Sequence, residues 1–301
     1  MTAVPAVPAV TAVPAAPSLP SRPLRFGVVL ISEDCSGAEW TAKCRRAETL
    51  GYDVIAVPDH LNLLSPFPTA VLAAEATEKA VIGTYVLNAA FHHPVLLARD
   101  VTTTGALIGG RLELGLGTGY VRSEFAALGL PDDPASRVRR LRRLVTGLDT
   151  LLEHKGPPLM IGGHGDRVLR LAARRAEIVS FTGAPYRPEY GRTALVGADE
   201  LLRRVEFVRA EAGPRAPRIE LNVLSKATVL TRDRRAGVET VRRYAPDLPP
   251  ERLLELPTLF VGTPAQIAEQ VLRHRETHGL TYFTVMETAM EDFGAVIELL
   301  R

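Results

Sequence analysis

Short apolar runs alternate with amphipathic segments along most of the chain. Eight of these runs are rich in Val, Ile, Leu and Phe, the composition of buried β-strands. They are Leu24–Ile31, Asp53–Val57, Val81–Leu87, Arg111–Leu116, Leu159–Ile161, Ile178–Phe181, Arg218–Leu224 and Leu280–Met286. Because the runs are nearly continuous in hydrophobicity and do not alternate with polar residues, they predict a parallel sheet whose two faces are both covered.

The segments between these runs carry apolar residues at helical spacing. The predicted helices are Ser36–Leu50, Thr69–Glu78, Pro94–Leu107, Ser136–His154, the stretch after Gly165, Asp199–Ala212, Thr263–His278 and Asp292–Leu300. Eight strand–helix units favour an α/β fold of the closed (β/α)8 TIM-barrel type over an open doubly wound sheet. The first strand also lacks the GxGxxG motif that opens a dinucleotide-binding fold.

Two parts of the chain depart from this alternation. Residues 1–22 repeat Ala-Val-Pro, and prolines at this density predict a disordered tail before a single domain over residues 23–301. Thr231–Leu256 predicts a helical insertion before the eighth strand, and Ala227–Leu230 is expected to extend or pair with the seventh. Tyr120–Ser136 is longer and less regular, as an active-site loop can be.

Composition and charge narrow the function classes. The net charge is +2, with one cluster of basic residues at Arg137–Arg143, so nothing favours a nucleic-acid partner. That cluster is expected to be a solvated helix face, or else a contact for substrate or partner. No run approaches the roughly 20 apolar residues of a membrane span, and the tail lacks a signal-peptide pattern. Two cysteines provide no disulfide framework, so a cytoplasmic protein is expected.

Polar and glycine residues follow five consecutive predicted strands. Chemistry in TIM barrels lies at the C-terminal ends of the strands. Those positions hold Asp59 and His60, Asn88, Gly117-Thr118-Gly119 with Glu124, Gly162–Arg167, and Thr182-Gly183. We therefore expect the active site at this rim.

Each rim residue has a functional and a structural interpretation. His60 is a candidate general acid or base, and Asp59 either orients it or caps the following turn. Glu124 binds substrate, holds a proton or is a solvated carboxylate. Asn88 either contacts a ring edge or caps a loop. We expect His92 and His93, which precede Pro94, to shape the entry of a helix.

The glycines at 162, 163 and 165 join a strand to a helix. They make either a tight turn or a phosphate site, because a helix N-terminus presents unpaired N–H groups. The series of polar strand ends favours the phosphate site. His164 and Asp166 lack a third ligand at suitable spacing, so no metal site is predicted.

Several long segments together resemble the bacterial luciferase-like monooxygenase superfamily, in particular its branch of deazaflavin (coenzyme F420)-dependent oxidoreductases. They are AETLGYDVIAVPDH, HHPVLLARDVTTTGALIGGRLELGLGTGYVRSEFAALG, IGGHGDRVLRLAARRAEIVSFTG and VGTPAQIAEQVLRHRETHGLTYFTV. The resemblance covers roughly residues 24–300 and implies a TIM barrel with an insertion. It implies a phosphate end of the cofactor site at Gly162, Gly163, His164, Gly165, Arg167 and Thr182. Asn88, Thr118 and Gly119 would flank the ring.

The same resemblance implies an activity. An Asp-His pair after the second strand occurs in deazaflavin-using relatives, so Asp59-His60 favours F420 over FMN. Some relatives carry an acid at or just beyond the glycine turn after strand four. Here Tyr120 follows Gly119, and Glu124 is the nearest acid. The implied reaction is hydride transfer to or from a small-molecule substrate, with the catalytic groups Asp59, His60 and Glu124.

Three other functions are weighed against this one. An FMN-dependent monooxygenase would need a separate flavin reductase, and a non-catalytic chain would be the partner subunit of an active homologue. A flavin-free lyase or aldolase would need a Schiff-base lysine or a metal set, and only Lys226 lies near a strand end. Homodimers are common in the resembling family, so a homodimer is expected.

Overall fold

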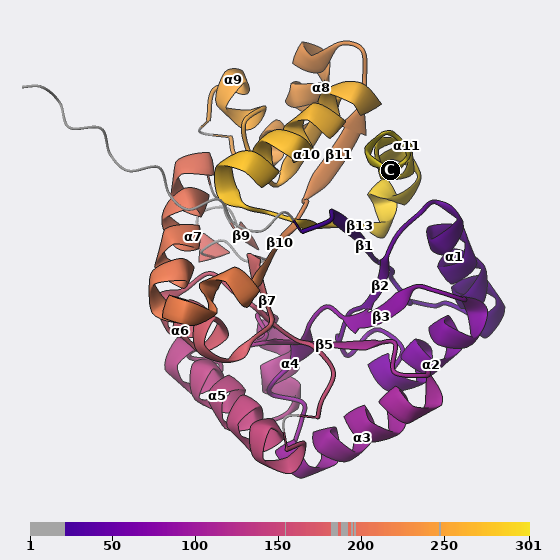
Figure 1. The fold of residues 1–301 in the computed structure, drawn as a ribbon, viewed down its shortest axis with the longest axis vertical. Coiled ribbons are helices and arrows are strands. Elements are labelled where there is room, and N and C mark those ends of the chain that lie inside the picture. Colours follow the sequence, from indigo (N-terminus) through magenta and orange to yellow (C-terminus); the bar gives the residue numbers. More distant parts are fainter. Residues whose placement is uncertain are drawn as a thin grey trace, which may run out of the picture.

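The computed structural model describes residues 22–153, 155–181, 186–187, 192–193, 195, 197–246 and 248–301. Eight parallel strands pair in the order β3-β2-β1-β13-β10-β7-β6-β5, and β3 pairs with β5 to close the ring (Figure 1). They are β1 (Arg25–Val29), β2 (Val54–Val57), β3 (Val81–Thr84), β5 (Leu112–Gly117), β6 (Leu159–Gly162), β7 (Ile178–Phe181), β10 (Glu220–Leu224) and β13 (Tyr282–Met286). The predicted TIM barrel is therefore confirmed. The Ala-Val-Pro repeat of residues 1–21 lies outside the described residues.

Helices surround the ring of strands (Figure 1). They are α1 (Gly37–Thr49), α2 (Pro66–Ala76), α3 (Pro94–Leu107), α5 (Pro134–Leu151), α6 (Asp166–Arg175), α7 (Ala198–Ala212), α10 (Pro264–His278) and α11 (Met290–Leu300). Local chemistry sets their ends. Ser36 with Glu39 forms a capping box at α1, and Thr263 with Gln266 forms another at α10. Pro94 opens α3, where its missing N–H costs nothing.

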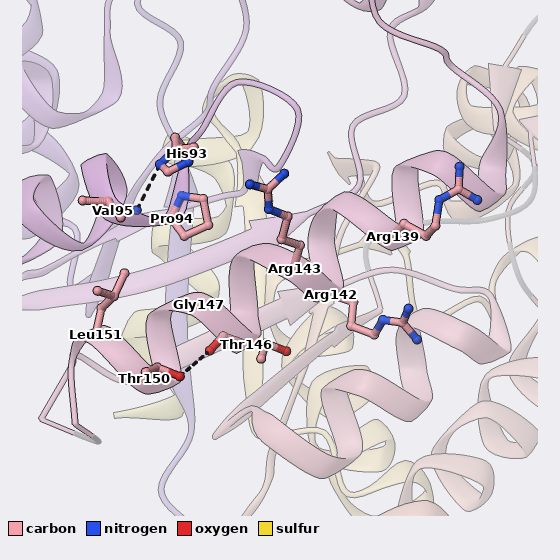
Figure 2. A pocket seen from close by; sticks show the side chains of 10 residues that line it. All are labelled: His93, Pro94, Val95, Arg139, Arg142, Arg143, Thr146, Gly147, Thr150 and Leu151. Carbon is pink, nitrogen blue, oxygen red and sulfur yellow. Dashed lines mark hydrogen bonds between the residues drawn. The ribbon is translucent and has the colours of Figure 1, made fainter.

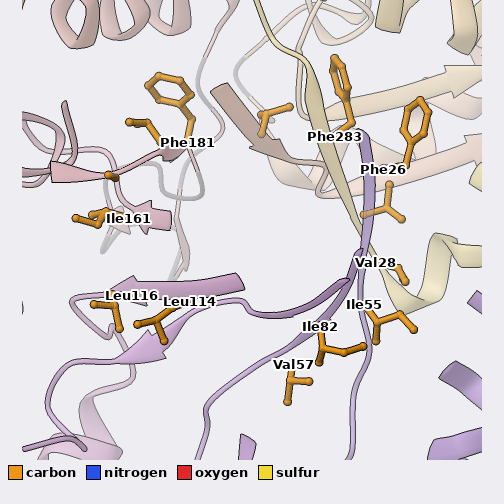
Figure 3. Close-up of a cluster of buried hydrophobic side chains, with 14 of the residues drawn as sticks. Phe26, Val28, Ile55, Val57, Ile82, Leu114, Leu116, Ile161, Phe181 and Phe283 are labelled. Atoms are coloured by element: carbon orange, nitrogen blue, oxygen red, sulfur yellow. The ribbon is translucent and has the colours of Figure 1, made fainter. Parts of the chain in front are cut away.

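Two apolar layers explain why the strands are apolar on both faces. Alternate side chains of each strand point outward and pack under the helices, and Figure 3 shows ten of them labelled, among them Phe26, Val28 and Ile55. The other side chains, such as Val29 and Met160, form a smaller cluster inside the barrel. A strand buried on both faces reads as a continuous apolar run.

The insertion differs from the prediction in one respect. It contains the helices α8 (Arg234–Val241) and α9 (Pro250–Leu253), as expected, with a 3-10 turn at Arg242–Tyr244. Residues Ala227–Leu230, however, neither extend nor pair with the seventh barrel strand. They form β11, which pairs in parallel with the unpredicted strand β12 (Leu259–Gly262). The insertion is thus a small α/β unit with its own apolar cluster.

Four short strands and helices and two turns of 3-10 helix complete the described fold. The two-residue strand β4 (Leu87–Asn88) pairs with β5, and α4 (Arg122–Ala127) lies within the segment expected to be irregular. β8 (Tyr186–Arg187) and β9 (Arg192–Thr193) form an antiparallel pair. Turns of 3-10 helix lie at Gly213–Arg218 and Glu287–Ala289. Among the described helices, none has the length and hydropathy needed to cross a membrane.

Candidate active site

Asp59 and His60 are adjacent in sequence but bind different partners at the end of β2. The Asp59 carboxylate accepts a hydrogen bond from the Asn88 backbone N–H at 3.0 Å and contacts the His92 Nε2 at 2.9 Å. His60 instead faces Glu124. In the described structure the Asp59 carboxylate therefore neither orients His60 nor caps the turn that directly follows it, the two roles expected from the sequence. It instead holds the later segment through the Asn88 backbone and the His92 ring. His92, expected to shape the entry of α3, is the ring partner of Asp59, whereas His93 caps that helix.

His60, Glu124 and Tyr120 form a chain of contacts over the rim. Glu124 lies on α4, is 6% exposed, and its Oε1 lies 2.9 Å from the His60 Nδ1. The same oxygen accepts the Leu61 backbone N–H at 3.1 Å. The Tyr120 hydroxyl lies 3.4 Å from the His60 Nε2, and the two rings meet edge to face at 5.5 Å.

These contacts indicate which ring nitrogen of His60 carries the hydrogen. An ionised carboxylate only accepts hydrogen bonds, so in a neutral imidazole the Nδ1 that faces Glu124 is the nitrogen that carries the hydrogen. The Nε2 is then an acceptor, and the Tyr120 hydroxyl donates to it. His60, just after β2, is thereby held in one orientation by Tyr120 from the loop after β5 and by Glu124 of α4.

Two polar atoms at this rim are buried without a partner in the described structure: Asn88 Nδ2 and Glu124 Oε2. The Asn88 Oδ1 accepts the Ala90 N–H at 3.1 Å, which leaves its amide hydrogens free. Gly119, with φ +69°, packs so closely that a Cβ there would lie 2.4 Å from the Asn88 Oδ1. An unsatisfied buried polar atom costs about 1–3 kcal/mol. A donor and an acceptor left open at one rim indicate a place for a polar ligand.

The glycine turn after β6 is a tight turn that leads into the N-terminus of α6. The Gly163 N–H donates to the Ser180 carbonyl at 3.0 Å, and a Cβ at Gly163 would lie 2.5 Å from Val168. That position therefore needs glycine for the tight turn. Gly165, the N-cap of α6, has open space at its Cβ position, and its carbonyl accepts the Val168 and Leu169 N–H groups. The N–H groups of Asp166 and Arg167 are therefore the ones that could bind an anion.

Charged groups surround the same turn. Arg204 forms ion pairs with Glu200 and with Asp166, the first residue of α6. Partial burial, and then the positive charge of Arg204, lower the pKa of His164, which favours a neutral ring. Arg167 is exposed, whereas Thr182 lies outside the described residues. No group of three or more His, Cys, Asp or Glu in the described part of the chain could hold a metal.

Beneath the rim, the inside of the barrel holds a polar network whose members satisfy one another. The hydroxyls of Tyr85 and Ser180 both donate to the Asn222 Oδ1, at 2.8 and 2.6 Å. The Asn222 Nδ2 donates to the Thr284 hydroxyl at 2.8 Å. These residues, which the sequence did not mark, form the floor of the site, and burial raises the pKa of Tyr85 well above its usual value.

A groove on the outer face of the barrel is separate from the rim residues. It has a volume of about 590 Å³ and lies between α3 and α5 (Figure 2). Arg139, Arg142 and Arg143 of the predicted basic face line it, together with His93 at the start of α3. None of the candidate catalytic or cofactor residues lines this groove.

Comparison with known proteins extends these observations. A family model described as luciferase-like monooxygenase matches residues 33–245. An F420-dependent glucose-6-phosphate dehydrogenase from Intrasporangium calvum is 30% identical over 235 residues, which cover 67% of this chain and 68% of the relative. A 4-hydroxyprotoasukamycin monooxygenase from Streptomyces nodosus subsp. asukaensis is 32% identical over 126 residues, 38% of this chain and 32% of the relative. In three further relatives named F420-dependent glucose-6-phosphate dehydrogenase, the match spans 55%, 43% and 41% of the relative.

Solved structures share the fold at low sequence identity. An F420-dependent secondary alcohol dehydrogenase in complex with an F420-acetone adduct superposes with a TM-score of 0.72 at 17% identity, covering 93% of this chain and all of that one. A long-chain alkane monooxygenase gives the same TM-score at 13% identity, with 93% and 91% covered. The family model spans more than two thirds of the sequence, within a barrel of the same architecture. The chain belongs to the luciferase-like monooxygenase family.

Proposed function

We propose that the chain is an oxidoreductase that uses coenzyme F420 to transfer a hydride to or from a small organic substrate. The observation that carries this proposal is the His60–Glu124 pair at 2.9 Å, at the same rim of the barrel as the unpaired Asn88 Nδ2. A polarised histidine suits proton transfer, and an open buried donor suits a ring carbonyl of a cofactor. Relatives named F420-dependent support the choice of cofactor.

The residues present fit a deazaflavin. Asn88, Thr118 and Gly119 would hold the ring, and the open Asn88 amide supplies the donor that a ring carbonyl needs. The phosphate would lie at the turn formed by Gly162, Gly163, His164, Gly165 and Arg167. Thr182, also expected at this end, lies outside the described residues. When bound, a deazaflavin gives or takes a hydride and reacts poorly with oxygen. The protein supplies orientation, phosphate binding and the proton.

Residues of the chain itself would transfer the proton that accompanies the hydride. The His60 Nε2 is the atom that accepts or returns a proton, because the Nδ1 is engaged by Glu124. The Glu124 carboxylate stabilises the imidazolium that forms when His60 is protonated. Asp59 holds the backbone of Asn88 and so positions the ring-binding amide. Asp59 is therefore a positioning residue in this proposal, whereas His60 is catalytic.

A second candidate is an FMN-dependent monooxygenase. Its support is the match to a monooxygenase from Streptomyces nodosus and the fold shared with an alkane monooxygenase. Titration of the purified protein with F420 and with FMN, followed by absorbance and fluorescence, separates the two. We expect saturable F420 binding and no stoichiometric FMN binding. Tight FMN binding without F420 binding would overturn the first proposal.

The third candidate, a non-catalytic partner subunit, is tested by a variant. His60→Ala in the F420-loaded enzyme should lower turnover of an accepted substrate about 10²–10⁴-fold, the usual contribution of a general acid or base. Cofactor affinity should change little. His93→Ala is the matched control, because His93 caps a helix on the outer groove. Unchanged turnover in His60→Ala would mean that His60 does not carry the chemistry.

A further inference from the structure

We infer that Tyr120 is the residue that exchanges the proton with the substrate, and that His60 and Glu124 act through it. This inference rests on the proposed oxidoreductase function of the same site and names a catalytic group that sequence analysis did not select. Its basis is an ordered series of contacts from a buried carboxylate, through an imidazole, to an exposed phenol.

The order of hydrogen bonds sets the direction of the series. The Glu124 Oε1 accepts the Leu61 N–H and faces the His60 Nδ1, so this oxygen acts as an acceptor. The His60 Nε2 is then the acceptor for the Tyr120 hydroxyl at 3.4 Å. Carboxylate, imidazole and hydroxyl follow one another as they do in hydrolase triads, with a phenol in place of the serine. Such contacts are often long without ligand and shorten in the reacting complex.

Exposure shows which member a substrate reaches first. Side-chain exposure rises from 7% for Glu124 to 26% for His60, and Tyr120 is 67% exposed. The Tyr120 ring packs edge to face on His60, with an angle of 83° between the ring planes. The phenol oxygen therefore lies over the Nε2 that would otherwise meet substrate. Tyr120 is placed to touch substrate, and His60 is placed to serve Tyr120.

The proton and electron counts balance for a substrate with a hydroxyl at the reacting carbon. The substrate O–H proton passes to the Tyr120 oxygen while the Tyr120 proton passes to the His60 Nε2. The carbon-bound hydrogen would leave with its electron pair, for which a bound oxidised deazaflavin would be the acceptor, and the substrate would become a carbonyl compound. His60 ends as an imidazolium beside Glu124. The reverse sequence reduces a carbonyl and protonates its oxygen through Tyr120.

The electrostatics of the phenol agree with this role. Partial burial, and then the negative charge of Glu124, raise the pKa of Tyr120 above its usual value. The hydroxyl therefore keeps its proton at neutral pH, as a donor to His60 must. The Tyr120 proton is therefore expected to move to the His60 Nε2 only in the step in which the substrate O–H proton moves to the Tyr120 oxygen.

Nitrogen NMR of protein labelled at its histidine rings tests the contact without substrate. In the wild type, we expect His60 as the Nδ1–H tautomer, with an Nε2 resonance shifted by hydrogen bonding. Tyr120→Phe should move the Nε2 resonance toward the value of a free imidazole nitrogen and leave the Nδ1 signal in place. Tyr244→Phe, on the insertion, is the control and should move neither. An Nε2 resonance unchanged in Tyr120→Phe would overturn the inference.

Kinetics of the F420-loaded protein test the catalytic role. With a hydroxyl-bearing probe that the wild type oxidises, such as 2-propanol or glucose 6-phosphate, Tyr120→Phe should lower kcat about 10²–10⁴-fold with little change in KM or in F420 affinity. Wild-type kcat in Tyr120→Phe would contradict the inference and leave the proposed function intact. Failure of the wild type to bind F420 would instead contradict the proposed function, while the NMR result would still decide the contact.

Discussion

The two ends of the barrel treat their polar groups in opposite ways. At the N-terminal end, Arg25 of β1 forms ion pairs with Glu113 at 2.8 Å and with Glu220 at 2.6 Å. The Tyr282 hydroxyl donates to Glu113 as well. At the C-terminal rim, Glu124 keeps one oxygen without a partner, and Asn88 keeps its amide nitrogen without one.

This difference separates stability from function. Buried polar groups in proteins are nearly always hydrogen-bonded, so an end that satisfies itself contributes to the fold. The end that leaves a donor and an acceptor without partners is the one where we propose that the cofactor binds. In TIM barrels, catalytic residues lie at the C-terminal ends of the strands, which is the open end here. We therefore expect substitutions at the N-terminal end to lower the free energy of unfolding, and substitutions at the C-terminal rim to lower the affinity for F420.

The largest effect is expected from removing the Arg25 ion pairs at the N-terminal end of the barrel, which we call the closed end because its polar groups pair with one another. Arg25→Met leaves Glu113 and Glu220 buried together without a cation, and loss of one partner of a buried ion pair costs about 3–5 kcal/mol. Burial raises the pKa of Glu113, and the positive charge of Arg25 opposes this rise. Without Arg25, the ionised form of this buried carboxylate would be destabilised further. Urea unfolding measures the change.

The control for that variant is an exposed pair. Arg46 and Glu291 are about half exposed, so Arg46→Met should cost no more than about 1 kcal/mol. F420 affinity of the folded Arg25→Met protein should equal that of the wild type. Equal losses of stability in the two variants would show that the buried ion pairs do not stabilise the closed end.

A smaller effect concerns an unpartnered buried atom far from the rim. The Nδ1 of His274 on α10 also lacks a partner in the described structure. Burial, and then the nearby His278, lower the pKa of His274 to about 3. The unfolded chain binds this proton near its ordinary pKa, so the free energy of unfolding falls as pH drops from about 6.5 toward 3.

The expected slope for His274 is up to about 1.4 kcal/mol per pH unit. His274→Leu should flatten the stability profile between about pH 4 and 6 without changing F420 affinity at neutral pH. Chemical unfolding across this pH range measures it. An unaltered slope would mean that His274 does not stay neutral in the folded protein. A changed F420 affinity would mean that unpartnered atoms far from the rim affect cofactor binding as the rim atoms do.

A matched pair of glycines sharpens the comparison at the rim. Gly119 and Gly109 both have positive φ, +69° and +63°, so an alanine at either position costs about 1 kcal/mol of backbone strain. Only at Gly119 would the new Cβ press on Asn88, because nothing lies within 4 Å of the Cβ position at Gly109. Gly119→Ala should therefore weaken F420 binding several-fold, and Gly109→Ala should leave it unchanged. Similar F420 affinities in the two variants would show that Asn88 does not contribute to cofactor binding.

Much of the fold followed from the sequence because its signals are local. The apolar runs marked all eight barrel strands, and Pro94 marked the first residue of α3. The strand Leu259–Gly262 was missed, because a four-residue apolar run beside a predicted helix has no periodicity of its own. Its partner Ala227–Leu230 was then given to the wrong sheet.

The candidate site was predictable in position but not in pairing. The rim residues follow from the rule for strand ends, whereas His60 meets Glu124 across 64 positions and Asp59 meets His92 across 33. Such contacts depend on how α4 and the loop before α3 fold back, and spacing does not encode them. The cofactor roles, the homodimer and the cytoplasmic location stay predictions.

The most direct measurement compares two buried asparagines. Asn222 is fully engaged in the barrel floor, whereas the Asn88 amide nitrogen is open. F420 affinity and the free energy of unfolding are measured for the wild type, Asn88→Ala and Asn222→Ala. The account predicts that Asn88→Ala, which removes one hydrogen bond to the Ala90 N–H, weakens F420 binding about tenfold and costs less stability than Asn222→Ala, which loses about 1–3 kcal/mol. Unchanged F420 affinity in Asn88→Ala would contradict the claim that the open rim binds the cofactor.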